Sequence, residues 1–269
     1  MTDFLKVEQT GYIVTLTMNH PARRNVLTGN SAAQEFQEVC SRLTADNNIR
    51  VAILTGAGPA FSAGGDLHDM QKYLGNDISL ARIRQDYRDG IQSLAMALFN
   101  LEIPIIAAVN GPAIGAGFDL ACFCDLRIAS TNAKFAESFL KVGLIPGDGG
   151  SWILPRIVGY AKAAEMTFTG DMLDANGALE AGIVSRVVEP SQLLPASFAL
   201  AERIAKHSGE TLRMAKRLLR AGQTQELATV LDMAAGFQAT AHKGPDHANA
   251  VAAFVGKNSH RINLPSTEN

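Results

Sequence analysis

Two glycine-rich loops of the sequence contain the residue types that could do chemistry. The first loop, AFSAGGDL, spans residues 60–67 and places Ser62 close to Gly64 and Gly65. Its Ala-x-Ser-x-Gly frame differs by one residue from the Gly-x-Ser-x-Gly turn that exposes a nucleophilic serine in many hydrolases. The glycines offer a second role, because a chain without Cβ atoms can bring its backbone N–H groups close to a ligand.

The spacing around Ser62 favours the backbone role. A nucleophilic turn needs a strand that runs directly into the serine. Here the apolar run VAILTG ends at Gly56, and the residues AGPAF separate it from Ser62. His242 and His247 follow in the order that such hydrolases use, so a nucleophilic Ser62 stays an alternative, which labelling with an active-site phosphonate would reveal.

A second loop of the same kind, NGPAIGAGFDL, spans residues 110–120. It follows a buried-strand pattern over residues 104–111 and precedes a helix that we expect to begin near Gly115. The first N–H groups of a helix have no intrahelical partner and lie at the positive end of its dipole. Two free amides, one from each loop and directed at one point, would form an oxyanion hole.

Alternating strands and helices must position these loops. β-Branched and aromatic residues around a Thr-Gly turn predict a hairpin, and apolar residues at helical spacing predict the helices between the strands. The sequence therefore predicts an α/β fold with short crossovers, and its 47% of hydrophobic residues suffice for one large core. The expected elements are hairpin 7–19, helix 31–43, strand 50–56, helix 78–100, strand 104–111, helix 115–125 and strand 126–131.

The last part of the chain has a different pattern. Residues 196–269 show helical periodicity without strand patterns, so we expect a helical C-terminal region after residue 195. One of its helices carries a basic face, which we interpret as solvated; a phosphate or RNA contact is the alternative. The basic residues are Arg213, Lys216, Arg217 and Arg220.

Composition narrows the class of protein. The chain has 24 basic and 26 acidic residues, and a net charge of -2 gives no general attraction to nucleic acid or to an anionic membrane. We find no signal-peptide pattern and no apolar run of membrane-spanning length, so a cytoplasmic protein without a membrane partner is expected. Cys40, Cys122 and Cys124 are predicted to be buried thiols, with neither a disulfide framework nor a metal site.

Five segments carry a resemblance to a known family: NHPARRNVLT (19–28), VAILTGAGPAFSAGGDLHDM (51–70), PIIAAVNGPAIGAGFDLACFCDLRIAS (104–130), AKFAESFLKVGLIPGDGGSWILPRIVG (133–159) and TGDMLDANGALEAGIVSRVV (169–188). In these segments the sequence resembles the crotonase superfamily, the enoyl-CoA hydratase/isomerase group. The resemblance implies a spiral of ββα repeats over residues 1–195 and C-terminal helices over residues 196–269 that form a homotrimer or a dimer of trimers. It implies an acyl-CoA substrate, as in fatty acid metabolism, with coenzyme A as part of the substrate and no separate cofactor.

The family pattern assigns residues to the binding site. It implies that the amides of Ala63 and Ala116 hold the thioester oxygen, where most relatives have glycine at the second position. Arg24 is a candidate phosphate partner, and Lys257 resembles a terminal lysine that reaches the CoA phosphates. The residues expected along the substrate and CoA path are Arg24, Val26, Leu27, Gly64, Gly65, Asp66, Leu67, Gly115 and Phe139.

The acid/base residues depart from the family pattern. Asp119 stands where typical hydratases have their first glutamate, three residues after Ala116 and on the same helix face. Phe139 replaces the second glutamate and cannot transfer a proton. Asp148, in the GDGG loop, is the second catalytic candidate, and capping of the following helix is its alternative role. Glu137 could point to the same side as Phe139 in an extended segment, at a depth that the sequence does not give.

These residues predict chemistry at a thioester enolate. Asp119 and Asp148 could form an acid/base pair that hydrates an enoyl-CoA. A single aspartate could instead move one proton between C4 and C2, which would make the protein an enoyl-CoA isomerase. A non-catalytic acyl-CoA-binding scaffold is the third reading, because the second glutamate is missing.

Overall fold

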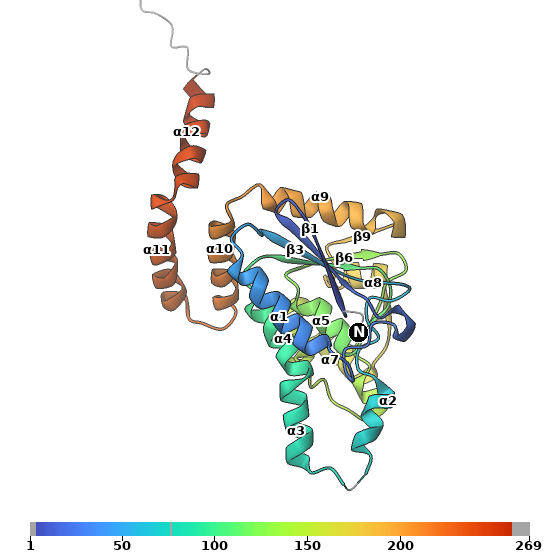
Figure 1. The fold of residues 1–269 in the computed structure, drawn as a ribbon. Helices are drawn as coiled ribbons and strands as arrows, with labels where there is room; N and C mark the ends of the chain where they lie inside the picture. Colours follow the sequence, from blue (N-terminus) through green and yellow to red (C-terminus); the bar gives the residue numbers. More distant parts are fainter. Residues whose placement is uncertain (1–3, 76, 260–269) are drawn as a thin grey trace, which may run out of the picture. The chain divides into compact units, whose positions relative to one another are not determined.

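The structure, a computed structural model, describes residues 4–75 and 77–259. Of residues 254 and 256–259 it describes only the backbone, so the predicted phosphate contact of Lys257 lies outside the described side chains. The chain forms two compact units, residues 1–209 and residues 210–269 (Figure 1). No helix within the described residues is both long enough and apolar enough to cross a membrane.

A six-stranded sheet forms the centre of the first unit. Its order is β1-β2-β3-β4-β6-β9, with β1 and β2 antiparallel and every later neighbour parallel. A smaller sheet has the order β5-β7-β8. The strands are β1 Leu5–Thr10, β2 Ile13–Met18, β3 Val51–Gly56, β4 Ile105–Val109, β5 Ala113–Ile114, β6 Leu126–Ser130, β7 Lys134–Ala136, β8 Leu173–Asp174 and β9 Arg186–Val188.

Helices cover both faces of the large sheet (Figure 1). Successive strand residues point to opposite faces, so Ile53 packs towards α9 while Ala52 and Leu54 belong to the larger core that includes α1 and α4. Both faces are apolar, as expected for parallel strands between helices. The helices of this unit are α1 Ala32–Ala45, α2 Leu67–Met70, α3 Leu80–Asp89, α4 Ile91–Asn100, α5 Ala116–Phe123, α6 Gly150–Val158, α7 Tyr160–Thr169, α8 Ala175–Glu180 and α9 Leu193–Ala205.

The predicted strands and helices are confirmed with one break. The helix expected over residues 78–100 is two helices, α3 and α4, separated at Gly90. Gly90 has φ -89° and ψ -112°, and a Cβ there would lie 2.7 Å from the Asp86 carbonyl oxygen. This backbone conformation ends α3 and starts α4 in a new direction.

The helical C-terminal region is confirmed, and its first helix belongs to the first unit. Helix α9 packs on β2, β3, β4 and β6, so the compact units divide after Gly209 instead of at residue 195. The second unit contains α10 Gly209–Ala221, α11 Leu227–Lys243 and α12 Pro245–Ser259, of which α10 begins at the last residue of the first unit. On α10, Lys216 is buried and Arg217 lies over the Phe237 ring, so this basic face is not solvated throughout.

Candidate functional site

The two glycine-rich loops lie against each other, as predicted. Ser62 pairs with Ala113 in an isolated parallel bridge, and the Ile114 N–H donates to the Ser62 carbonyl at 3.0 Å. A Cβ on Gly64 would lie 2.3 Å from the Ile114 carbonyl oxygen and 3.1 Å from the Ala116 nitrogen. Only glycine therefore allows the first loop to reach the start of α5.

Ser62 supports this loop and is not a nucleophile. Its side chain is fully buried, at 0% exposure. The hydroxyl donates to the Asn25 carbonyl at 2.7 Å and accepts the Gly64 N–H at 3.1 Å. The two histidines of the hydrolase alternative, His242 and His247, face each other at 3.0 Å within the second unit. The alternative of a nucleophilic Ser62 is therefore wrong.

Ser62→Ala tests the supporting role. The substitution leaves the Asn25 carbonyl and the Gly64 N–H without a buried partner, so we expect the free energy of unfolding to fall by about 1–3 kcal/mol. Urea denaturation measures this change, and Ser41→Ala at an exposed site is the matched control, with little expected effect. A fluorophosphonate that labelled wild-type Ser62 would contradict the assignment.

The free amides of the two loops differ from the predicted ones. The Ala63 N–H donates to the Arg24 carbonyl at 2.9 Å, so this amide is already used and the assignment of Ala63 to an oxyanion hole is not retained. The Gly65 N–H and the Ala116 N–H donate to no residue within the described part of the chain. Ala116 is the first residue of α5, where the N–H has no intrahelical partner.

Asn25 holds the first loop in place, a role that the sequence reasoning missed. It is fully buried in the left-handed conformation with φ 56°. Its amide donates to the carbonyls of Ala57, Ala60 and Phe61, and its oxygen accepts the His20 N–H. The available signal was the residue type, because asparagine tolerates positive φ better than other non-glycine residues.

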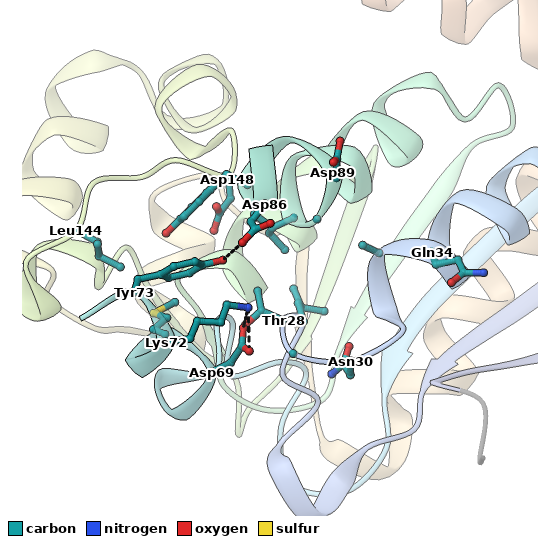
Figure 2. Close-up of a pocket in the computed structure, with 18 of the residues that line it drawn as sticks. Thr28, Asn30, Gln34, Asp69, Lys72, Tyr73, Asp86, Asp89, Leu144 and Asp148 are labelled. Carbon is teal, nitrogen blue, oxygen red and sulfur yellow. Dashed lines mark hydrogen bonds and ion pairs between the residues drawn. The ribbon is translucent and has the colours of Figure 1, made fainter. Parts of the chain in front are cut away.

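A cavity of about 540 Å³ opens beside these loops. Figure 2 shows Asp148 and Leu144 towards one end, near Tyr73, and Gln34 at the other end. Four of the predicted site residues line the cavity: Leu27, Gly65, Phe139 and Asp148. In the part of the chain that the structure describes, no group of three or more His, Cys, Asp or Glu side chains could hold a metal ion.

The other residues predicted to contact CoA lie outside the cavity lining. Arg24 is exposed, and its neighbour Arg23 forms the ion pair with Asp66 at 2.6 Å. The Asp66 carboxylate also accepts the His68 N–H at 3.0 Å, so Asp66 binds the protein itself and caps α2. The predicted residues that do not line the cavity are Arg24, Val26, Gly64, Asp66, Leu67 and Gly115.

Asp119 and Asp148 meet at a small void of about 10 Å³, whose walls also include Ala116. Asp148 lines both this void and the open cavity, so this residue lies between them. It does not cap α6, because Gly149 occupies the cap position without a side-chain hydrogen bond. Instead Asp119 Oδ2 accepts the Gly150 N–H at 3.0 Å and satisfies the first residue of that helix.

Glu137 lies beside Asp119. Its side chain is 0% exposed and that of Asp119 is 1% exposed. A Cβ on Gly150 would lie 2.3 Å from Asp119 Oδ1 and 2.6 Å from Glu137 Oε1, so both carboxyl groups converge next to the Gly150 backbone. Phe139, two residues later, instead faces the cavity and lies 3.6 Å from the position of a Cβ on Gly115.

Burial raises the pKa of all three carboxyl groups. The pKa of Asp148 rises to about 7, mainly through burial and then through the charge of Asp119. Burial, with a smaller contribution from the Asp148 charge, raises the pKa of Glu137 to about 7. The pKa of Asp119 lies well above its ordinary value because of burial and the neighbouring Glu137, and the Gly150 N–H opposes the shift. Carboxyl groups with such pKa values can exchange protons near neutral pH.

The raised pKa of Asp148 predicts a pH-dependent stability. The unfolded chain releases this proton near pH 3.8 and the folded chain near pH 7, so the folded state binds more protons between these values and loses stability as the pH rises. Asp148→Asn removes this loss. Relative to wild type, we expect the variant to gain about 2–3 kcal/mol in unfolding free energy between pH 5 and pH 8.

Urea denaturation at the two pH values measures the difference. Glu180→Gln, at an exposed site on α8, is the control and leaves the pH dependence of wild type unchanged. An equal pH dependence for Asp148→Asn and wild type would contradict the placement of Asp148.

Comparison with known proteins relates this chain to one enzyme family. Residues 8–262 match the enoyl-CoA hydratase/isomerase family. The chain is 35% identical over 262 residues to the 1,2-epoxyphenylacetyl-CoA isomerase of Escherichia coli (strain K12), covering 96% of this chain and 98% of that protein. It is 32% identical over 254 residues to the short-chain-enoyl-CoA hydratase of Clostridium acetobutylicum, covering 93% and 94%.

Solved structures give the same result for the fold. An enoyl-CoA hydratase from Bacillus anthracis aligns with a TM-score of 0.88 at 31% identity, covering 95% of this chain and 97% of that chain. DspI from Pseudomonas aeruginosa aligns with a TM-score of 0.87 at 32% identity, covering 95% of each chain. The α/β fold, the helical C-terminal region and the match along nearly the whole sequence lead to one conclusion: this chain is an enzyme of the enoyl-CoA hydratase/isomerase family, in the crotonase superfamily.

Proposed function

We propose that this enzyme adds water across the C2=C3 bond of a 2-enoyl-CoA thioester, with Asp119 and Asp148 as its acid/base pair. The observation that carries the proposal is the position of Asp148, which lines both the open cavity and the void shared with Ala116 and Asp119. Relatives named as enoyl-CoA hydratases support the same substrate class.

The unpaired amides supply the oxyanion hole of this proposal. We assign it to the N–H groups of Gly65 and Ala116, which come from the two interlocked loops and donate to no described residue. Hydrogen bonds from both amides would stabilise the negative charge that develops on the thioester oxygen. The Ala116 amide lies at the positive end of α5, which adds to this stabilisation.

The two aspartates then divide the proton transfers. The Asp148 carboxylate accepts a proton from water, and the water oxygen forms its bond to C3. The C2=C3 electrons move towards the thioester and form the enolate held by the two amides. Protonated Asp119 gives its proton to C2, so one water molecule is added and no separate cofactor is consumed. The raised pKa values of both groups suit proton transfer near neutral pH.

The CoA moiety would lie along the first loop. Leu67 supports this placement because it is apolar and 58% exposed beside that loop. Arg24 is exposed and available for a phosphate, to which a guanidinium can donate two parallel hydrogen bonds. Self-association as a trimer or a dimer of trimers completes the proposal, and it is supported by exposed leucines on the C-terminal helices, Leu219, Leu227 and Leu231.

Double-bond isomerisation is the second candidate. It is favoured by the observation that, of the three buried acids whose pKa is raised, Asp119, Glu137 and Asp148, only Asp148 lines the open cavity. One carboxylate suffices to carry a proton between C4 and C2. In this reaction Asp148 alone would be the proton carrier.

Isotope labelling distinguishes the candidates. Crotonyl-CoA is incubated in heavy-oxygen water and a 3-enoyl-CoA in heavy water, each with wild type, Asp119→Asn and Asp148→Asn, and the products are analysed by mass spectrometry. Hydration predicts heavy oxygen at C3, lost in both variants. Bond migration without oxygen uptake, lost only in Asp148→Asn, would establish the isomerase. Tight binding of CoA thioesters without turnover would refute both and leave an acyl-CoA-binding scaffold.

A further inference from the structure

The buried side of the site contains a carboxyl group that the proposed reaction does not yet use. Glu137 follows β7, and its side chain is completely buried. Neither of its oxygens accepts a hydrogen bond from any N–H or O–H donor of the described residues. The same holds for Asp119 Oδ1, whereas Asp119 Oδ2 accepts the Gly150 N–H. The unpartnered oxygens of the two residues are those that converge beside Gly150.

Two ionised carboxylates cannot be stable in this arrangement. Both are removed from water, they repel each other, and neither forms an ion pair with a lysine or arginine of the described chain. A proton between them removes one charge and supplies the donor that both oxygens lack. The geometry therefore requires a proton at the point where Asp119 Oδ1 meets Glu137.

We propose that Asp119 and Glu137 hold one proton in common, and that Glu137 is a positioning residue that keeps Asp119 protonated for the reaction. The inference rests on the proposed function, in which Asp119 protonates C2. Glu137 acts through Asp119, because it lines neither the cavity nor the void. It takes over the second acidic position of the site, although its place in the sequence is two residues before Phe139.

A shared proton suits the chemistry of an enolate. Two carboxyl groups that share one proton release it only to a strong base, since a dianion would remain in a buried site. The C2 carbon of a thioester enolate is such a base. The pair therefore keeps the acid intact in the resting enzyme and gives up its proton once the enolate forms.

Other charged groups surround the pair. Asp148 faces it from the loop before α6, and its charge raises the pKa of Glu137. The Gly150 N–H at the start of α6 favours the charged form of Asp119. The Cys122 thiol of α5 interacts with both carboxyl groups, and it also interacts with the Arg127 guanidinium of β6.

Infrared spectroscopy tests the shared proton without substrate. A buried carboxylic acid has a C=O stretch that shifts in heavy water, and Asp148 is mostly ionised at pH 8. We expect wild type and Asp148→Asn to show this band at pH 8. In Glu137→Gln the new amide can donate to Asp119, so the pH at which the band disappears should fall by about one unit or more. Glu180→Gln, an exposed control, leaves the band unchanged.

The pH profile of turnover tests the positioning role. Glu137→Gln should lower kcat only slightly at pH 5, where Asp119 is protonated without help, and by about 10- to 100-fold at pH 8. A loss that is equal at all pH values would show a merely structural role and overturn the inference. Absence of the band in wild type would also overturn it, and this measurement needs no variant to fold. A wild-type protein with the band but without turnover of acyl-CoA thioesters would refute the proposed function alone.

Discussion

We expect Asp148→Asn to lower kcat for hydration of a 2-enoyl-CoA by about 10²- to 10⁴-fold, the range typical of a lost general acid or base. The side chain keeps its shape but can no longer accept a proton from water. Of the buried acids, Asp148 alone lines the open cavity, and burial raises its pKa to about 7, which suits it to take a proton from water. Stopped-flow or steady-state measurement of crotonyl-CoA absorbance gives the result directly.

Asp89→Asn is the matched control for this prediction. Asp89 also lines the cavity and is exposed, with its carboxylate bonded to Gln85, so its removal should change kcat little. Wild-type activity in both variants would contradict the role of Asp148. A similar loss in both would contradict it as well and would indicate a general effect of negative charge in the cavity.

Gly150→Ala should displace both buried carboxyl groups of the pair, Asp119 and Glu137. The added Cβ would lie 2.3 Å from Asp119 Oδ1 and 2.6 Å from Glu137 Oε1, so both carboxyl groups must move. Moving Asp119 also strains its hydrogen bond with the Gly150 N–H. We expect overpacking to cost about 1–3 kcal/mol of stability and the displaced acid to cost about 100-fold in kcat.

Gly236→Ala separates this local effect from a general glycine effect. Gly236 lies in helix α11, and no atom comes within 4 Å of a Cβ at that position. Alanine is the better helix former, so this variant should gain about 0.5–1 kcal/mol. Urea denaturation and turnover are measured for both variants. Unchanged activity in Gly150→Ala would contradict the convergence of the two carboxyl groups at this glycine.

The order of strands and loops could be predicted because the apolar runs of the sequence, and the glycines and prolines that bound them, coincide with the strands and turns of the fold. Apolar runs bounded by glycine and proline are the buried strands β3 and β4, and the glycine-rich stretches that follow them are the interlocked loops. The break at Gly90 was not predicted, because the apolar periodicity of residues 78–100 continues through it. Only the backbone conformation at that glycine shows the change of direction.

The position of Glu137 could not be obtained from alternation. In a continuous strand, residues 137 and 139 would point to the same side. Strand β7 ends at Ala136, and Ser138 has φ -88° and ψ 12°, so the chain leaves the extended conformation between them. Glu137 consequently turns to the interior while Phe139 turns to the cavity.

The use of the Ala63 N–H could not be predicted from the sequence for a similar reason. The motif identifies the loop, but hydrogen bonding decides which amide is free, and the partner of the Ala63 N–H is a carbonyl 39 residues earlier, at Arg24. For Asp148, the residue was predicted from the sequence but its role was not. Its two candidate roles, acid/base and helix cap, were equivalent in the sequence, and the structure gives the capping role to Asp119 instead.

The central claim is that the site forms a thioester enolate and that Asp119 exchanges a proton with C2. Exchange of the C2 hydrogens of butyryl-CoA with heavy water tests it most directly, because this saturated thioester can neither be hydrated nor isomerised. When the shared proton lies on Glu137, the Asp119 carboxylate can take a proton from C2, and the enolate can then recover a deuteron. We therefore predict that wild type incorporates deuterium at C2, measured by mass spectrometry, and that Asp119→Asn exchanges about 100-fold or more slowly. Absence of exchange by a wild-type protein that binds butyryl-CoA, or equal exchange by Asp119→Asn, would contradict the account.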